Sequence, residues 1–111
     1  MHPKYRRMIK IMEKKEGSYR RGSNDKWVLY ILQCANNTFY TGVTKNLERR
    51  IKMHNDGKAS RYTRARRPVA LIYQEDCKSH AQALIRECQV KALSKKEKVI
   101  LVLKQAPEGK G

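Results

Sequence analysis

The feature that most constrains the fold is a pair of short β-rich segments separated by a tight turn. Trp27–Leu32 is dense in β-branched and aromatic residues and too short for a typical helix, so it predicts a buried strand. Thr38–Val43 predicts a second strand, and Ala35–Asn37 between them supplies turn chemistry because Asn tolerates positive φ. The two segments therefore predict an antiparallel hairpin.

Capping signals and apolar runs predict the elements that follow the hairpin. The expected helices are Leu47–His54 behind the cap residue Asn46 and before Asn55-Asp56-Gly57, Ser79–Leu93 with a Ser79-x-x-Gln82 capping pattern, and Ser94–Leu103 with Ser94-x-x-Glu97. Lys58–Pro68 predicts a loop, and Val69–Tyr73 predicts a third strand with Pro68 at its start. The predicted fold class is α+β, a small three-stranded antiparallel sheet flanked by helices in the order β-β-α-β-α-α.

The charge of the chain indicates a polyanionic partner. The sequence holds 26 Lys+Arg against 10 Asp+Glu, a formal net charge of +16, and Trp27–Gly111 alone holds 17 and seven. The excess therefore belongs to the folded part, and nucleic acid is the leading partner because its phosphates favour distributed cations. No apolar run approaches the roughly 18 residues of a membrane span, and no secretory signal is evident. Three cysteines without a C-x-x-C pair fit a reducing compartment, so we expect a soluble cytoplasmic protein with no membrane or obligate protein partner.

Composition divides the chain into three parts. Residues 1–26 predict a basic, mobile arm, 27–104 the folded domain, and 105–111 a flexible tail. The arm either clamps a nucleic-acid backbone or is a solvated extension. A third use, binding to anionic lipid, would need a long amphipathic helix that the arm lacks.

Two pairs of residues in the folded part have the chemistry of a catalytic site. Arg50 and His54 lie four residues apart, so a helix projects both along one edge of its apolar stripe; the alternative is that both are ordinary surface residues. Tyr30 and Tyr40 lie on the opposed strands of the hairpin, where aromatic packing would also explain them. If their hydroxyls face a basic pocket, neighbouring cations would favour the phenolate, which can accept a proton from water.

Glu87 is the only acidic residue within the helix predicted at Ser79–Leu93. An isolated carboxylate near a core edge is costly unless a cation satisfies it. Arg86 or Lys91 would satisfy it as an ion pair, and a hard divalent ion is the functional alternative.

The segment Lys58–Arg67 is strongly basic and contains no acidic residue. Its cations and its aromatic residue are Lys58, Arg61, Arg64, Arg66, Arg67 and Tyr62. Arg binds phosphate with a planar fork and Tyr62 can stack on an unpaired base, so the segment suits a nucleic-acid backbone, with solubility as the rival explanation.

These pieces together resemble the GIY-YIG nuclease superfamily, and most closely its small stand-alone bacterial single-domain branch. The matching residues are Val28-Leu29-Tyr30, Tyr40-Thr41-Gly42, Leu47–Ile51 with His54, and the helical Arg86-Glu87. The first motif has Val28 where the family name has Gly, and the second has Thr41 in place of Ile. The resemblance covers about Trp27 to Leu103.

The resemblance implies a role for each matching residue. One of Tyr30 and Tyr40 would be the general base and the other would position groups, Arg50 would grip the phosphate, His54 would be an active-site histidine and Glu87 would hold one divalent cation. Gly42 would let the backbone pass close to substrate or turn the strand. The residues expected to contact nucleic acid are Gly42, Lys45, Arg49, Lys58, Arg61, Tyr62, Arg64, Arg66 and Arg67.

The expected function is therefore a metal-dependent endonuclease that hydrolyses DNA with one Mg²⁺ or Mn²⁺ ion, in repair, recombination or the processing of single-stranded or branched DNA. The alternative is a non-catalytic DNA- or RNA-binding module that retains the fold. The superfamily similarity does not choose between single-stranded, duplex and branched substrates.

Overall fold

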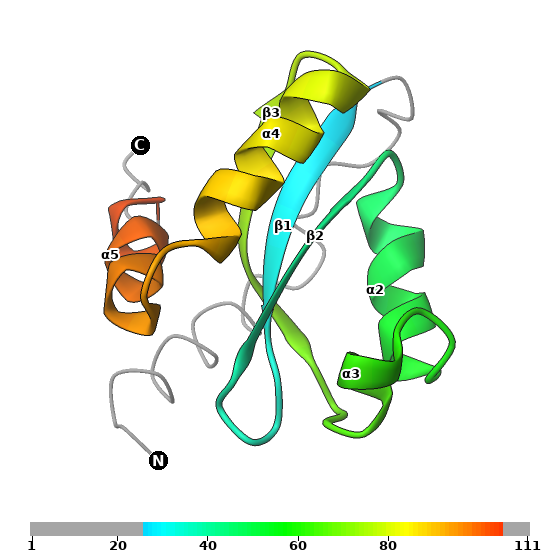
Figure 1. Cartoon of the computed structure of the whole chain (residues 1–111). Helices are drawn as coiled ribbons and strands as arrows, with labels where there is room; N and C mark the ends of the chain where they lie inside the picture. The colour runs from blue at the N-terminus through cyan, green and yellow to red at the C-terminus, as the bar shows by residue number, and fades with distance from the viewer. Residues whose placement is uncertain (1–25, 106–111) are drawn as a thin grey trace.

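The computed structural model describes residues 26–105, and these form one sheet with helices on both of its faces (Figure 1). The elements in chain order are β1 (Trp27–Gln33), β2 (Phe39–Thr44), α2 (Leu47–Asn55), α3 (Arg61–Arg64), β3 (Ala70–Cys77), α4 (His80–Lys91) and α5 (Lys95–Gln105). The sheet order is β2-β1-β3, and both strand pairs are antiparallel. The predicted α+β class is confirmed. The arm predicted at 1–26 lies outside the described residues except for Lys26, and the tail at 105–111 lies outside them except for Gln105.

The alternation of side chains along β1 divides the core into two layers. Leu29 and Ile31 point to the face covered by α4 and α5, where Val90, Val99 and Val102 pack against them. Val28, Tyr30 and Leu32 point to the opposite face, where α2 supplies Leu47 and Ile51. Because successive side chains of a strand point to opposite faces, every residue of the central strand β1 except Trp27 is buried. Figure 1 shows α2 with α3 on one side of the sheet and α4 with α5 on the other.

The predicted turn and caps form as expected. Asn37 has a φ of 72° in the hairpin turn. The Asn46 side chain accepts a hydrogen bond from the Arg49 backbone N–H at 3.1 Å and so caps α2. Ser94 and Glu97 complete a reciprocal capping box at α5, with bonds of 3.1 and 2.8 Å. These local bonds fix where the helices begin.

Two predictions about the fold were wrong in part. The segment Lys58–Pro68, expected as a loop, contains α3, whose N-cap is Ser60. The third strand continues past Tyr73 to Cys77, because β3 lies at the edge of the sheet, where polar side chains can face solvent. No helix in the described part of the chain is long and apolar enough to cross a membrane.

Candidate active site

The two tyrosines of the hairpin lie on the sheet face that α2 covers. Tyr30 pairs with Gly42 across the strands, and Tyr40 pairs with Leu32, so the tyrosines are diagonal neighbours on one face. Their ring centroids are 6.4 Å apart. Tyr30 is only 1% exposed, whereas Tyr40 is half-buried. The hairpin therefore gives the two phenols different access to solvent.

Gly42 provides space for the Tyr30 ring. A Cβ at Gly42 would lie 2.6 Å from the Tyr30 hydroxyl oxygen and 2.8 Å from Cζ, distances that real Cβ atoms do not adopt. Gly42 does not turn the strand, because the pairing of β1 with β2 runs through it without a break. Its contact with substrate stays a prediction.

His54 is a buried partner of Tyr30 rather than a surface residue. Leu47, Ile51 and His54 recur at helical spacing and form the buried stripe of α2. The His54 side chain is fully buried, its Nε2 atom lies 2.9 Å from the Tyr30 hydroxyl oxygen, and its ring stacks edge-on to Tyr40 at 4.9 Å. Arg50, one turn earlier, is half-exposed. The surface interpretation is therefore wrong for His54.

The environment of this cluster keeps both Tyr30 and His54 neutral. Burial and, as the smaller cause, the positive charge of Arg50 together lower the pKa of His54 from 6.5 to about 4. Burial also raises the pKa of Tyr30 well above its usual value of 10, and negative charge on Tyr40 acts in the same direction. Arg50 opposes this rise by its positive charge, but burial dominates. The nearby cation favours the Tyr30 phenolate in the expected direction, and burial outweighs it.

Thr63 and Ser60 extend the cluster, and sequence reasoning missed both. Thr63 Oγ1 lies 2.7 Å from His54 Nδ1 and 3.0 Å from Ser60 Oγ. Ser60 caps α3 by accepting a hydrogen bond from the Thr63 backbone N–H at 3.1 Å. The Ser60-x-x-Thr63 spacing inside the basic segment was the available signal, since it is typical of a helix cap.

The predicted basic segment borders this cluster. Tyr62 is 37% exposed, stacks beside Tyr40 at 6.2 Å, and has the Arg66 guanidinium 3.8 Å from its ring centroid. Lys58, Arg61 and Arg64 are exposed, as are Lys45 and Arg49 at the start of α2.

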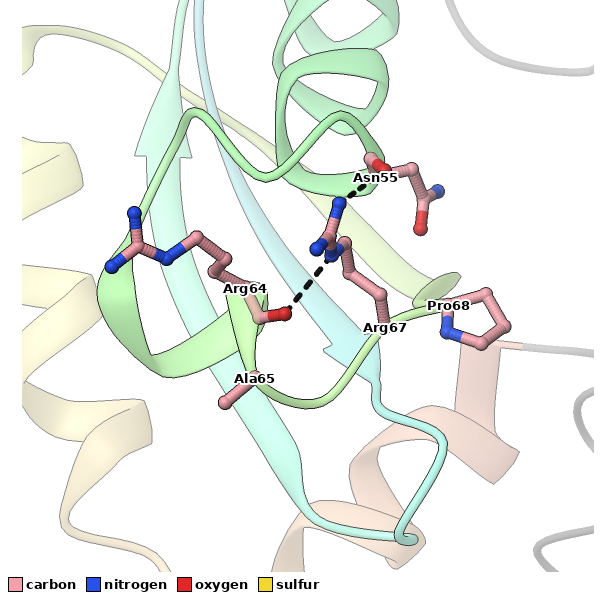
Figure 2. A pocket seen from close by; sticks show the side chains of 5 residues that line it. All are labelled: Asn55, Arg64, Ala65, Arg67 and Pro68. Carbon is pink, nitrogen blue, oxygen red and sulfur yellow. Dashed lines mark hydrogen bonds between the residues drawn. The ribbon is translucent and has the colours of Figure 1, made fainter.

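Two of the arginines also have structural contacts. Arg66 donates to the Tyr62 carbonyl at 2.8 Å. Arg67 donates through Nε to the Arg64 carbonyl at 2.9 Å and through a terminal nitrogen to the Asn55 carbonyl at 3.5 Å (Figure 2). Asn55, Arg64 and Arg67 line a pocket of about 440 Å³, together with Ala65 and Pro68. A second cavity of about 480 Å³ is lined by Lys58, Arg61 and Arg64, with Gly57, Ala59 and Ser60 between them. The segment therefore offers hollows lined by cations.

Glu87 lies on α4, at the other end of the site. Its carboxylate forms an ion pair with Lys91 at 3.2 Å, and its side chain is 20% exposed. Arg86, the other predicted partner, instead binds Glu75 at 2.7 Å. The negative charge of Glu87 contributes to the raised pKa of Tyr30, so the carboxylate lies within electrostatic reach of the phenol.

The donor set at Glu87 suits a loosely held hard cation. Within residues 26–105 no group of three or more His, Cys, Asp or Glu side chains gathers as a closed metal cage. Mg²⁺ commonly binds one or two carboxylates and keeps several waters, completing its shell with substrate phosphate. Glu87 would supply one carboxylate to such a shell.

A family model and several curated relatives match most of the described residues. A model of the GIY-YIG catalytic domain matches residues 26–99. A UPF0213 protein of Desulfotalea psychrophila is 51% identical over 77 residues, covering 68% of this chain and 70% of the relative. Another from Staphylococcus haemolyticus is 44% identical, covering 69% and 94%. The solution NMR structure of a UPF0213 protein from Bacillus halodurans, 41% identical, covers 74% of this chain and 88% of that one with a TM-score of 0.48. The chain therefore belongs to the GIY-YIG catalytic domain family.

Proposed function

We propose that this protein is a metal-dependent endonuclease that hydrolyses phosphodiester bonds in DNA. Membership of the GIY-YIG family implies a nuclease-type function on nucleic acid. The observation that carries the proposal is that groups from α2 and α4 act on one phenol of β1. Tyr30 is hydrogen-bonded to His54, and the charges of Arg50 and Glu87 act on its pKa. We assign this activity to residues 27–104, with 1–26 as a basic arm and 105–111 as a tail.

Arg50 is the residue that binds the scissile phosphate. It is half-exposed, and its positive charge acts on both Tyr30 and His54. A fixed guanidinium next to the phosphate stabilises the negative charge that develops during attack. A bound Mg²⁺ or Mn²⁺ ion on Glu87 would supply Lewis-acid stabilisation of the leaving 3′ oxygen.

The two tyrosines divide the work because their surroundings differ. Tyr30 is buried, holds its proton and binds His54, so it is suited to positioning rather than to accepting a proton. Tyr40 is the more accessible of the two, and we assign to it the removal of the proton from the attacking water.

The basic segment binds the part of the DNA strand that flanks the cleaved bond. Lys58, Arg61 and Arg64 line a cavity, and Lys45 and Arg49 extend the positive surface along the start of α2. Tyr62 adjoins Tyr40 and Arg66 lies over the Tyr62 ring, so both would contact a nucleotide next to the cleaved bond.

The test is cleavage of labelled single-stranded, duplex and branched DNA by the full chain, with Mg²⁺, with Mn²⁺ or with EDTA. We expect metal-dependent nicking that Glu87→Gln abolishes while DNA binding is kept, since one carboxylate does not attract phosphate. Glu48→Gln makes the same charge change at an exposed position of α2 and should remain active. Cleavage that survives in Glu87→Gln would refute the assigned metal ligand. Tight, salt-sensitive binding without cleavage under any metal would indicate the non-catalytic binding module instead.

A further inference from the structure

Thr63 lies at the centre of the basic segment, yet its side chain is fully buried and points to His54. The two residues are joined by a 2.7 Å contact between Thr63 Oγ1 and His54 Nδ1. On the opposite side of the imidazole, Nε2 contacts the Tyr30 hydroxyl at 2.9 Å. The imidazole therefore bridges two hydroxyl groups, and each contact can in principle run in either direction.

The neighbours of Tyr30 decide the direction of its contact with His54. Arg50 lies near the Tyr30 phenol, since its positive charge lowers the pKa of that phenol, and a guanidinium cannot accept the Tyr30 proton. If His54 Nε2 donated to that oxygen, the Tyr30 proton would have no acceptor among the contacts of the described residues, inside a side chain that is 1% exposed. The Tyr30 hydroxyl therefore donates to Nε2, and a neutral His54 carries its proton on Nδ1.

The Thr63 hydroxyl oxygen is placed to accept a hydrogen bond from His54 Nδ1–H. Its own hydroxyl proton has two acceptors on Ser60, the Oγ atom at 3.0 Å and the carbonyl oxygen at 3.4 Å. The Thr63 backbone N–H donates to Ser60 Oγ at 3.1 Å, which fixes Thr63 relative to Ser60. A Thr63 hydroxyl that donates to Ser60 leaves its lone pairs toward His54 Nδ1–H.

We propose that Thr63 is a positioning residue that holds neutral His54 as the Nδ1–H tautomer and thereby aims the Tyr30 hydroxyl oxygen at Arg50. The chain of hydrogen bonds then runs in one direction, from Tyr30 through His54 and Thr63 to Ser60, and the lone pairs of the Tyr30 oxygen stay open toward Arg50. The part that concerns Arg50 and phosphate rests on the proposed function, whereas the tautomer does not. The basic segment that contacts nucleic acid would in this way also orient the residue that binds the scissile phosphate.

The tautomer can be measured directly by NMR of the full chain labelled with ¹⁵N at histidine, without nucleic acid, near pH 7. His54 is assigned by its loss in His54→Asn. We expect a protonated Nδ1 and an unprotonated Nε2 in the wild type. Finding the proton on Nε2 in the wild type would overturn the proposal, whether or not any variant folds.

Variants of Thr63 separate positioning from packing. Thr63→Val keeps the shape but cannot accept, so it should move His54 toward the Nε2–H form, and Thr63→Ser should restore Nδ1–H. Thr38→Val makes the same change at the hairpin turn and should leave the tautomer as it is. An unchanged tautomer in a folded Thr63→Val protein contradicts the proposal.

Cleavage provides the second readout. In Thr63→Val we expect kcat to fall by about tenfold, the size of one lost orienting hydrogen bond, with unchanged DNA affinity and recovery in Thr63→Ser. Equal kcat values in wild type and Thr63→Val would overturn the step through Arg50. If the wild type cuts no substrate, the proposed function fails, while the tautomer measurement still decides the role of Thr63.

Discussion

Gly42 lies directly opposite Tyr30 in the antiparallel register, and any Cβ at this position would lie 2.6 Å from the Tyr30 hydroxyl oxygen. Because Tyr30 is buried and hydrogen-bonded to His54, moving its ring away from Gly42 would disturb that bond and the surrounding packing. The pair therefore acts as one packing unit, in which the absence of a side chain on β2 sets the place of a phenol on β1.

The first prediction is that Gly42→Ala displaces Tyr30. We expect a loss of about 1–3 kcal/mol in the free energy of unfolding, the usual cost of overpacking, measured by urea denaturation. Cleavage should also fall, because the displaced phenol loses its bond to His54. Gly57→Ala is the matched glycine control: its φ of +79° makes it costly by about 1 kcal/mol, but its Cβ meets the flexible Arg67 guanidinium and not Tyr30. Equal stability and activity of Gly42→Ala and wild type would contradict the packing argument.

The second prediction concerns pH. The folded protein keeps His54 neutral down to about pH 4, whereas an exposed histidine of the unfolded chain binds a proton near pH 6.5. Between these values the unfolded state binds more protons, so stability is full above pH 6.5 and falls as the pH drops toward 4, by up to about 3 kcal/mol. Urea unfolding at a series of pH values should show this slope, and His54→Gln should remove it. His80→Gln, which alters a histidine stacked on Trp27, should keep the slope.

The third prediction is that Arg50 affects both chemistry and the state of its neighbours. In Arg50→Gln the pKa of His54 should rise but stay below 6.5, because burial, the larger cause, remains. An NMR titration of His54 measures this rise. The rate of cleavage should fall by about 10²–10³-fold, as for loss of one fixed donor to a developing oxyanion. Arg49→Gln removes an equal charge from the adjacent exposed position and should leave the titration of His54 unchanged. Similar effects of the two changes would contradict the assignment of these roles to Arg50.

Local signals in the sequence predicted most of the fold. Asn37 tolerates the positive φ of the turn, and the side chains of Asn46 and Ser94 accept hydrogen bonds from the backbone of the helices that they cap. These effects are local, so they can be predicted without knowing the tertiary structure. Helix α3 escaped because it spans only Arg61–Arg64, less than two turns, and has no apolar periodicity to reveal it. The extension of β3 to Cys77 depends on its pairing with β1, which residues distant in sequence decide.

The candidate site was harder to predict than the fold for a physical reason. Residue types and spacing identified Tyr30, Arg50 and His54, but the sign of the Tyr30 pKa shift depends on burial against charge, and only packing shows that burial dominates. The sequence likewise left the partner of Glu87 open between Arg86 and Lys91. In the structure β3 lies beside α4, so Arg86 pairs with Glu75 and Lys91 pairs with Glu87. Thr63 reaches His54 across nine residues through a short helix that the sequence did not reveal.

The fourth prediction separates phosphate contacts in the basic segment from general charge. Arg61 and Arg64 are exposed and line the same cavity, which borders α2. If each binds one backbone phosphate, Arg61→Gln and Arg64→Gln should each weaken DNA binding at low salt. Each should also reduce the slope of log K against log salt by about 0.7–0.9.

Lys96→Gln is the control for this measurement, because it removes the same charge from α5, on the opposite side of the sheet (Figure 1). Long-range attraction alone would make the three variants alike, since each lowers the net charge of the protein by one. A contact with phosphate instead releases a counterion locally, so only Arg61→Gln and Arg64→Gln should change the slope. Three equal slopes would show that the segment attracts DNA without contacting it, and would remove these two arginines from the binding site while leaving the assignments of Arg50 and Glu87 intact.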